Sequence, residues 1–273
     1  MLARTFACMR KTPVTGVVFV AFVACCAAAI APAFASKARP NVYEATLEEQ
    51  GQKTPEISTD ELRAILAKAG AIVFDARPQQ EYAMAHIPGS INLDEKQLGR
   101  ITQNYPDQTT SMVVYSNGPF CDWARRGSEE LVRLGYSRVS RYQLGLPVWR
   151  ILGYPAETSL PGFRQVFRSG NAVIVDARSR AEYAAGTIPA AQSILGGEAS
   201  KAKEDRRLRY LDANTRILVF ASSAREARAV AEELTRNAYP NTSYFDGSYE
   251  ELKRAKFFSE RKPPLSNFDG LTR

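Results

Sequence analysis

The sequence predicts an α/β fold built from two consecutive copies of one unit, each a mainly parallel sheet flanked by helices. Two observations carry this prediction. Short apolar segments of strand length alternate with longer segments of helical periodicity, and Val73-Phe-Asp-Ala-Arg77 returns as Ile174-Val-Asp-Ala-Arg178, 101 residues later. A period of about 100 residues is the length of a domain rather than of a solenoid repeat. The chain of 273 residues has room for two such domains.

The repeat extends beyond this first motif. Glu81-Tyr-Ala83 matches Glu182-Tyr-Ala184 at the same offset of 101. The apolar segment Val113-Val-Tyr115 matches Leu218-Val-Phe220 at an offset of 105, so a few residues are inserted between the two motifs in the second copy. The matches fall in the same order, which indicates duplication of a whole unit.

The first copy opens with an amphipathic helix. Ser58-Thr-Asp-Glu61 has the pattern of a capping box, the following apolar residues share one helical face, and Gly70 is expected to end the helix. The continuous apolar character of 111–115 predicts a central strand covered on both faces. The other predicted elements are strands at 71–74, 91–93 and 138–142, and helices at 81–85, 123–134 and 147–152.

The second copy follows the same order. Strands separated by helices favour a parallel sheet, whose site lies at the carboxyl ends of the strands. We therefore expect the chemistry in the loops after Tyr115 and after Phe220. The predicted elements are a first helix containing Phe163 and Phe167, strands at 172–175, 216–220 and 243–245, and helices at 224–236 and 249–255.

The first 35 residues predict a cleaved secretory signal peptide. Three basic residues precede an uncharged segment over 12–36, and Ala33-Phe-Ala35 has the small-x-small pattern of a cleavage site. The segment is long enough for a membrane span, but Pro32 breaks the helix just before the cleavage site, which favours removal over retention as an anchor. We expect an exported, periplasmic protein without membrane contact once the leader is removed.

Export changes the cysteine count. Cys8, Cys25 and Cys26 leave with the leader, so Cys121 is the only cysteine of the mature chain and no intramolecular disulfide can form. A single thiol in an oxidising compartment is a liability unless it is buried or used. Cys121 is therefore the first candidate for chemistry.

Charge and histidine content exclude several function classes. Removal of the leader's three basic residues lowers the formal net charge from +7 to +4, and no dense block of Lys or Arg remains, so no nucleic-acid partner is expected. His86 is the only histidine, and it is expected in a turn, so the sequence does not favour a serine hydrolase triad or a multi-histidine zinc site. No metal and no cofactor are expected. The predicted organisation is a leader at 1–35, a linker at 36–56, domains at 57–156 and 157–256, and a tail at 257–273.

The motifs of the first copy resemble those of the rhodanese-like (sulfurtransferase) domain. Asp75-Ala-Arg77, Glu81-Tyr82 and His86-Ile-Pro-Gly89 follow one another as in that family, and Gly145-x-Pro-x-Trp149 matches its closing segment. The resemblance covers nearly all of residues 57–155. It implies a tandem rhodanese-like protein whose second copy has diverged further.

In the second copy the Asp-x-Arg and Glu-Tyr motifs persist, but Thr187 replaces the histidine. In the family these residues shape turns at the strand ends, and we expect ion pairs and hydrogen bonds from them rather than reaction. The residues expected in this structural role are Asp75, Arg77, Glu81 and His86 in the first copy, and Asp176, Arg178 and Glu182 in the second.

The resemblance also identifies the loop expected to react. In active rhodaneses a cysteine directly follows the central strand, where backbone N–H groups and the next helix favour a thiolate and then an anionic persulfide. Here that position is Ser116, and in the second copy it is Ala221, followed by Ser222 and Ser223. None of these side chains can carry a persulfide, so the second copy is expected to be inactive.

Cys121 lies five residues further along the first loop. Some rhodanese-like sequences carry a Tyr-Cys-x-Gly-Pro-x-Cys loop, and this chain resembles that form with the first cysteine lost. The start of the following helix favours the Cys121 thiolate, whereas the adjacent Asp122 disfavours it. A phosphatase loop needs Arg six positions after its cysteine, where this chain has Gly127. The residues expected to line the loop and bind an anion are Ser116, Asn117, Gly118, Phe120, Trp123, Arg125 and Arg126.

Two functions remain open at this stage. The first is a sulfurtransferase that moves sulfane sulfur from a donor such as thiosulfate to a thiophilic acceptor through a Cys121 persulfide. Its partners would be a small sulfur-containing anion and a thiol or protein acceptor. The second is a catalytically inactive tandem module that uses the empty loops to bind an anion or a partner protein, with Cys121 merely filling space under the loop.

Overall fold

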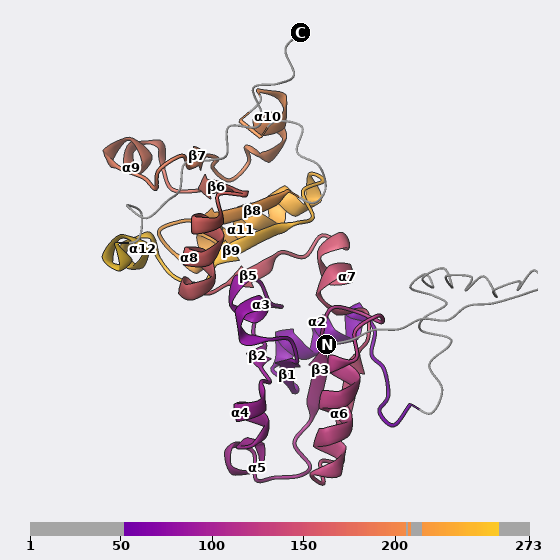
Figure 1. Ribbon diagram of the computed structural model, residues 1–273. Coiled ribbons are helices and arrows are strands. Elements are labelled where there is room, and N and C mark those ends of the chain that lie inside the picture. The colour runs from indigo at the N-terminus through magenta and orange to yellow at the C-terminus, as the bar shows by residue number, and fades with distance from the viewer. Residues whose placement is uncertain (1–51, 206, 209–214, 257–273) are drawn as a thin grey trace, which may run out of the picture. The chain divides into compact units, whose positions relative to one another are not determined.

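The computed structural model describes residues 52–205, 207–208 and 215–256, all within one compact unit of the chain (Figure 1). The predicted leader, the predicted tail and most of the linker lie outside these residues. Within them, every strand belongs to one of two sheets, and all strand pairings inside the sheets are parallel. The predicted α/β class with two parallel sheets is confirmed. None of the described helices is long and apolar enough to cross a membrane.

The first sheet has the strand order β2-β1-β3-β4. Its central strand β3 is the segment that the sequence predicts to be covered on both faces, and all four of its residues are buried. The strands are β1 (Ile72–Asp75), β2 (Ile91–Asn92), β3 (Met112–Tyr115) and β4 (Val139–Tyr142). The helices are α2 (Thr59–Lys68), α3 (Gln79–Met84), α4 (Glu95–Leu98), α5 (Ile101–Asn104), α6 (Trp123–Arg133) and α7 (Gly145–Ile151).

The second sheet has five strands in the order β5-β9-β8-β6-β7. Its central strand β8 is buried from its second residue onward. The strands are β5 (Ala156–Thr158), β6 (Ala172–Asp176), β7 (Gln192–Ser193), β8 (Arg216–Phe220) and β9 (Thr242–Phe245). The helices are α8 (Leu160–Ser169), α9 (Arg180–Ala185), α10 (Ala199–Glu204), α11 (Ala224–Arg236) and α12 (Tyr249–Ala255).

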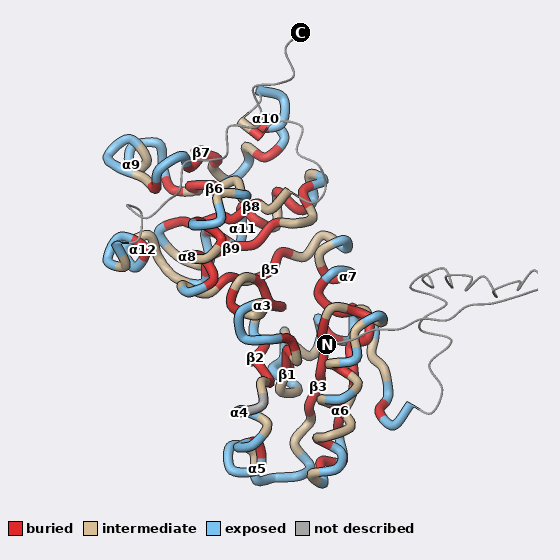
Figure 2. The backbone as a smooth tube through the Cα atoms, in the orientation of Figure 1, coloured by how far each residue is buried: buried red, intermediate tan, exposed pale blue. Residues whose placement is uncertain are grey.

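Helices cover both faces of each sheet, so each sheet separates two apolar layers. In the first domain, Val73 and Tyr115 pack on the side of α2 and α7, whereas Phe74 and Val114 pack on the side of α6. The second domain has the same alternation, with Phe220 beside Phe163 of α8. Figure 2 shows the strands of both sheets as mostly buried. This pattern explains why the strands are continuous apolar runs in the sequence.

The end of α2 differs from the prediction. The capping box at its start is present, because Ser58 and Glu61 bond each other's backbone N–H groups. At its other end Ala69, not Gly70, takes the left-handed conformation, with a φ of 48°. The Ala69 N–H then bonds the last carbonyls of the helix, and the Gly70 N–H also reaches Ile65 O. The helix therefore ends one residue earlier than a glycine signal alone predicts.

The register of the two sheets brings the motif residues to the same edge. Asp75 pairs with Tyr115 on one side and with Asn92 on the other, all at the carboxyl ends of their strands. In the second sheet Asp176 pairs with Phe220 in the same way. The Asp-x-Arg motif and the loop after the central strand are therefore neighbours in both domains.

The short strand β5 joins the two domains. It pairs with β9 in the second sheet, while Glu157 of the same strand forms an antiparallel bridge to His86 of the first domain. Glu56 holds the equivalent place in the first domain, where it bridges to Arg141 of β4. The second sheet thus includes Ala156, one residue before the domain boundary expected at 157.

Helices α3 and α8 form the closest contact between the domains. The Ser159 N–H donates to Ala83 O over 3.0 Å, and the Thr158 hydroxyl donates to Met84 O over 3.0 Å. A Cβ atom at Gly162 would lie 1.8 Å from Ala83 O. Only a glycine lets the two backbones come this close.

Candidate active site

The candidate site of the first domain is the loop of residues 116–122, which leaves β3 at its carboxyl end and leads into α6. Gly118 has a φ of +95°, a conformation that other residues rarely adopt, and its backbone lies against Leu144. Gly145 packs even more tightly, because a Cβ atom there would lie 2.4 Å from both Ser116 O and Gly118 N. The start of α7 therefore fixes the shape of the loop.

Ser116 occupies the first position of the loop and is 1% exposed. Its carbonyl accepts a hydrogen bond from the Leu146 N–H over 3.1 Å, and its Oγ lies 3.5 Å from Cys121 O. No base contacts the Ser116 hydroxyl in the described part of the chain, so nothing there activates it as a nucleophile.

Cys121 lies at the other end of the loop and is half-buried. Its N–H donates to Gly118 O over 3.0 Å, which closes a tight turn, and Asp122 directly precedes the first residue of α6. The described residues provide no hydrogen-bond partner for the Cys121 sulfur. The thiol thus lies before the start of an eleven-residue helix, where the helix dipole favours an anion.

Several backbone N–H groups of the loop are unpaired. Apart from that of Cys121, those of Asn117, Gly118, Phe120 and Asp122 donate to no acceptor within the described residues. Unpaired N–H groups at a helix start are the groups that bind anions. The loop therefore keeps the donors of an anion-binding turn.

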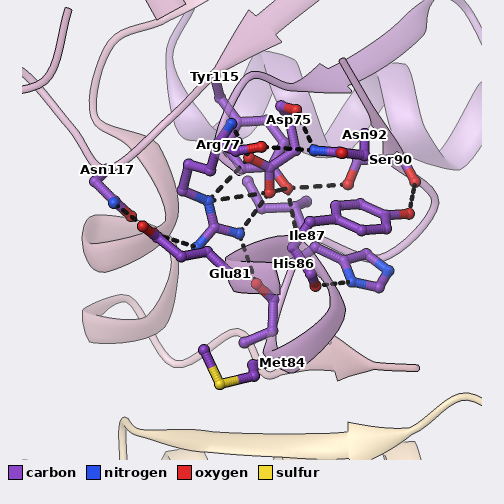
Figure 3. Close-up of polar contacts among 12 residues, drawn as sticks. Asp75, Arg77, Glu81, Met84, His86, Ile87, Ser90, Asn92, Tyr115 and Asn117 are labelled. Atoms are coloured by element: carbon purple, nitrogen blue, oxygen red, sulfur yellow. Dashed lines mark hydrogen bonds and ion pairs between the residues drawn. The ribbon is translucent and has the colours of Figure 1, made fainter. Parts of the chain in front are cut away.

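The Asp75 carboxylate organises the polar groups at this edge of the sheet (Figure 3). Asp75 is fully buried and accepts hydrogen bonds from the Arg77 Nε over 2.9 Å and from the Tyr115 hydroxyl over 2.7 Å. Arg77 also donates to Ala85 O and lies 3.8 Å from Glu81. Asn117 of the loop donates to Glu81 over 2.9 Å, which ties the loop to this network.

Burial and charge set the protonation of the network. Burial alone would lower the pKa of Arg77, but hydrogen bonds and attraction to Asp75 outweigh it and raise that pKa. Burial, together with repulsion from the Asp75 carboxylate, raises the pKa of Tyr115 well above its ordinary value. Tyr115 thus stays a neutral donor and Arg77 a cation, which suits a structural role.

Comparison with known proteins identifies the family. The rhodanese-like domain family matches residues 58–152 and again residues 162–255, together more than half of the chain. The chain belongs to the rhodanese-like domain family.

Its relatives include sulfurtransferases. The thiosulfate sulfurtransferase GlpE of Pseudomonas entomophila is 32% identical over 103 residues, which are 38% of this chain and 90% of the relative. The human thiosulfate:glutathione sulfurtransferase is 31% identical over 108 residues, 35% of this chain and 92% of its own length. The crystal structure of a thiosulfate sulfurtransferase from Pseudomonas aeruginosa is 23% identical, with a TM-score of 0.33, and covers 74% of this chain and 42% of that structure. The two matches to the family model establish the tandem rhodanese-like organisation of this chain, and its curated relatives include sulfurtransferases.

The arginines predicted to bind an anion beside the rhodanese loop differ in their surroundings. Arg125 lies between Asp122 at 3.3 Å and Glu129 at 3.6 Å, so two carboxylates already share its charge. Arg126 is exposed, and its side chain makes no hydrogen bond or ion pair with a described residue. It lines a hollow of about 680 Å³ together with Trp123, Asp94 and Glu130, and Cys121 is not among the residues that line this hollow. Phe120 is 58% exposed and projects from the loop rather than into the core.

His86 lies in the contact between the two rhodanese domains. Its ring stacks on Tyr82 with centroids 3.9 Å apart, and its Nδ1 lies 2.9 Å from Tyr82 O. Its Nε2 lies 3.4 Å from Glu157, whose carboxylate also accepts from the Tyr244 hydroxyl of β9. The histidine is therefore placed on the seam between domains, away from the loop.

The second rhodanese domain keeps the Asp-x-Arg network, but the loop after its central strand is shorter. Arg178 bonds Asp176, Ser222 donates to Glu182 over 3.0 Å, and the guanidinium of Arg178 lies 3.4 Å from the ring centroid of Tyr249. The Tyr249 N–H bonds Ala221 O, as that of Leu146 bonds Ser116 O in the first domain. The loop has only three residues before α11, Ala221, Ser222 and Ser223, and Ser223 caps that helix.

Two substitutions compensate each other in the second domain. Phe220 replaces Tyr115 and so provides no hydroxyl for the buried carboxylate. Thr187, at the position of His86, donates to Asp176 over 2.6 Å instead. The network therefore keeps a hydroxyl donor although both residues have changed.

Sequence analysis missed three residues of the first site. Asn92 donates to the carbonyls of Asp75 and Arg77, and Ser90 joins the Tyr115 hydroxyl at 2.9 Å. Arg150 of α7 carries buried nitrogens without a partner. Ser90 and Asn92 follow the His-Ile-Pro-Gly turn. They could have been predicted, because the carboxyl ends of neighbouring parallel strands lie side by side. Arg150 has no sequence signal, because no local pattern in α7 predicts that its guanidinium is buried.

Proposed function

We propose that the first domain is a sulfurtransferase that carries sulfane sulfur as a persulfide on Cys121. The observation that carries this proposal is the position of the thiol, before the first turn of α6 in a loop whose amides are unpaired. Relatives over this length of chain include a thiosulfate sulfurtransferase and a thiosulfate:glutathione sulfurtransferase. Thiosulfate is the proposed donor class, and a small thiol or a protein thiol is the proposed acceptor.

The proposed reaction has two balanced steps. The Cys121 thiolate attacks the outer sulfur of thiosulfate, a new S–S bond forms, the S–S bond of thiosulfate breaks, and sulfite leaves with the electron pair. The acceptor thiolate or cyanide then attacks the outer persulfide sulfur. The Cys121 thiolate leaves with its electrons, and the cycle closes without net oxidation of the protein.

The surrounding residues supply charge rather than proton transfer. The amides of Asn117 and Gly118 and the start of α6 stabilise the negative charge of the thiolate and of the persulfide. Arg126, exposed in the first turn of α6, adds positive charge that attracts the dianionic donor toward this end of the domain. Arg125 contributes less because Asp122 and Glu129 share its charge.

The second domain has a supporting role in this proposal. Its loop carries Ala221 at the equivalent position and has only three residues before α11, so it holds no sulfur. It instead packs on α3, the helix that follows Asp75 and Arg77.

Mass spectrometry tests the proposal directly. The chain without its leader is treated with thiosulfate and weighed intact, and one added sulfur atom is expected. The adduct should be absent in Cys121→Ser, and cyanide should remove it with release of thiocyanate. A Ser222→Ala variant in the second loop is the matched control and should react like the wild type. Absence of both the adduct and thiocyanate contradicts the proposal.

The second candidate function is a binding module without sulfur transfer. The observation that favours it is Ser116, fully buried at the position where an active rhodanese carries its cysteine. A Ser116→Cys, Cys121→Ser double variant separates the two functions. If Cys121 carries sulfur, Cys121→Ser alone removes the thiosulfate reaction. If the loop only binds anions, thiosulfate still protects Cys121→Ser from thermal unfolding, and only the double variant acquires a sulfur adduct.

We further propose that the protein is exported to the periplasm after cleavage near residue 35. The basic start, the apolar segment and Ala33-Phe-Ala35 support this. Cell fractionation followed by N-terminal sequencing tests it. A mature protein that begins close to residue 36 in the periplasmic fraction is expected, and an unprocessed chain held in the membrane contradicts cleavage.

A further inference from the structure

His86 is a buried titratable side chain that the proposed sulfur transfer does not use. It is 3% exposed, and the chain contains no other histidine. The His86 N–H donates to Glu157 O over 2.9 Å, and the Glu157 N–H donates to His86 O over 2.8 Å. These two backbone hydrogen bonds hold His86 directly opposite Glu157 of β5, in the contact between the two domains.

Both ring nitrogens of His86 face groups that accept hydrogen bonds. Nδ1 lies 2.9 Å from Tyr82 O, and a backbone carbonyl has no proton to donate. Nε2 lies 3.4 Å from the Glu157 carboxylate. A neutral imidazole has one N–H and one bare nitrogen, so it can donate to only one of these acceptors. The doubly protonated imidazolium donates to both and therefore fits this position better.

Tyr82 holds the His86 ring in this orientation. The two rings stack with centroids 3.9 Å apart and an angle of 18° between their planes. The Tyr82 hydroxyl donates to Ser90 O over 2.7 Å. Burial, followed by repulsion from Glu157, raises the pKa of Tyr82 to about 12. Tyr82 is thus a fixed, neutral ring, and its π face favours a cation over a neutral imidazole.

On the side of the first domain, the charged groups next to Tyr82 are paired with each other. Asp75 bonds the Arg77 guanidinium, and Glu81 lies 3.8 Å from the same guanidinium. The counter-charge of His86 therefore comes from the second domain.

Glu157 supplies the negative charge opposite His86. Its Oε1 faces the His86 ring, and its Oε2 accepts from the Tyr244 hydroxyl over 2.8 Å. Burial alone would raise the pKa of Glu157, but hydrogen bonds from His86 and Tyr244 outweigh it and lower that pKa. Burial, together with repulsion from Glu157, raises the pKa of Tyr244 well above its ordinary value, so the hydroxyl keeps its proton. The carboxylate is therefore ionised and accepts from both sides.

Further charged groups lie near this pair on the side of the second domain. The Asp246 N–H donates to Thr158 O over 3.0 Å, which places Asp246 beside β5. Burial, together with repulsion from Glu157, raises the pKa of Asp246 to about 6. Arg228 and Glu232 of α11 pair with each other at 2.9 Å and line the same hollow of about 860 Å³ as Glu157. Because the Glu157 side chain is 23% exposed and lines this hollow, protons reach the pair from solvent.

We propose that His86 and Glu157 form a proton-dependent ion pair that controls how firmly the two domains hold together. With His86 protonated, the imidazolium and the carboxylate attract each other beside the two backbone hydrogen bonds. Loss of one ring proton leaves a bare nitrogen facing an acceptor, and the contact weakens. The change falls between about pH 5 and 8, the range in which histidine changes charge. The pair is separate from the Cys121 loop, so the inference stands whether or not the proposed sulfur transfer does.

The neighbouring carboxylates also respond to pH. The pKa of Asp246 is raised in the folded protein, so its contribution to stability is present at low pH and is lost as the pH rises through about 6. The pKa of Glu157 is lowered, so its contribution is lost as the pH falls below the ordinary range of a carboxylate. The contact should therefore be firmest near about pH 5.5, and a test has to separate His86 from Asp246.

A double-mutant cycle in thermal unfolding tests the pair. His86→Gln and Glu157→Gln each remove one half of it, and the double variant removes both. At about pH 5.5 each single variant should lower the Tm by about 4 °C, and the double variant should lower it no further. At about pH 8 the effects of the two substitutions should simply add, because the ion pair is no longer formed. Glu232→Gln, which removes another carboxylate of the same hollow, is the matched control, and its effect should add to that of His86→Gln at both pH values.

NMR of the imidazole provides a second readout that keeps His86 in place. Because the chain has a single histidine, its ring nitrogen signals need no assignment. The midpoint of their pH titration should be lower in Glu157→Gln than in the wild type, since the variant no longer stabilises the imidazolium, and unchanged in Glu232→Gln. Equal midpoints in the wild type and Glu157→Gln would overturn the proposal. Additive losses of Tm at about pH 5.5, or a pH dependence of the cycle that disappears in an Asp246→Asn background, would also overturn it.

Discussion

Asp75 is the residue that holds the first site together. It is fully buried and accepts from Arg77, from the Tyr115 hydroxyl and from the Arg77 backbone N–H. Because Arg77 is also buried, Asp75 is its closest counter-charge among the described residues; Glu81 lies further away, at 3.8 Å. A buried cation without its partner is far more costly than an exposed one.

Replacement of Asp75 by Asn should therefore destabilise the protein strongly. We expect a loss of about 3–5 kcal/mol in the free energy of unfolding, since the amide keeps the shape but not the charge. Urea unfolding measures the loss. Asp60→Asn is the control: Asp60 and Arg63 form an exposed pair at 3.2 Å, whose removal should cost less than about 1 kcal/mol. Equal effects of the two substitutions would show that Asp75 carries no buried charge pair.

Part of this network around Asp75 could be predicted from the sequence. The Asp-x-Arg motif and the neighbouring Glu81 predict an ion-pair network, because charged residues at a buried strand end need partners. In the first domain Tyr115 donates a hydroxyl to the buried carboxylate, and in the second domain Thr187 does so. This change of donor could not be predicted. It depends on which side chains meet across the sheet and the following turn, and no local pattern encodes that meeting.

At the scale of elements, the start of α7 determines the shape of the Cys121 loop. Gly145 has a φ of +65° and lies against Ser116 O and Gly118 N. Gly153 has a similarly positive φ of +87°, but a Cβ atom there would meet nothing within 4 Å. The two glycines share the backbone conformation and differ only in the loop contact.

This pair of glycines gives a matched test. Gly153→Ala should cost about 1–2 kcal/mol from the left-handed backbone alone. Gly145→Ala should cost about 3 kcal/mol, since displacement of the loop adds to the same backbone strain. The reaction rate of Cys121 with a thiol reagent should change in Gly145→Ala and stay unchanged in Gly153→Ala. An unchanged rate in both would show that α7 does not set the loop.

Most elements could be predicted from periodicity, capping residues and turn signals. Helix α11 and strand β8 begin and end where the sequence predicts, because a serine cap and a continuous apolar run define them. The end of α2 and the start of α7 differ by one or two residues. There Ala69 and Gly145 are placed by packing against neighbouring segments, which outweighs local preference.

At the scale of the whole molecule, the two domains meet through α3 and α8. Gly162 has no room for a methyl group, since Ala83 O occupies that space. Gly162→Ala should therefore push the helices apart and lower the Tm by about 5 °C. Gly196→Ala, where a Cβ atom would meet nothing within 4 Å, should leave the Tm within about 1 °C.

The same variant also provides the result that would contradict this contact. A Gly162→Ala protein with the wild-type Tm would show that the domains do not pack through this glycine.

The tandem fold itself could be predicted, because duplicated motifs at a constant offset do not depend on knowing any contact. The seam could not. His86 belongs to a turn motif, and it acquires its neighbour Glu157 only when the other copy of the unit packs on it.

The strand β5 makes the second copy dependent on the segment that precedes it. Residues 156–158 lie between β9 and His86, so they complete one sheet while their backbone bonds the other domain. A fragment that starts after Thr158 would leave the edge of β9 open to other strands. Proteolysis of this segment would therefore have two effects: it would separate the domains, and it would expose an unpaired sheet edge that can bind other strands. The second copy therefore depends on residues 156–158 to complete its own sheet.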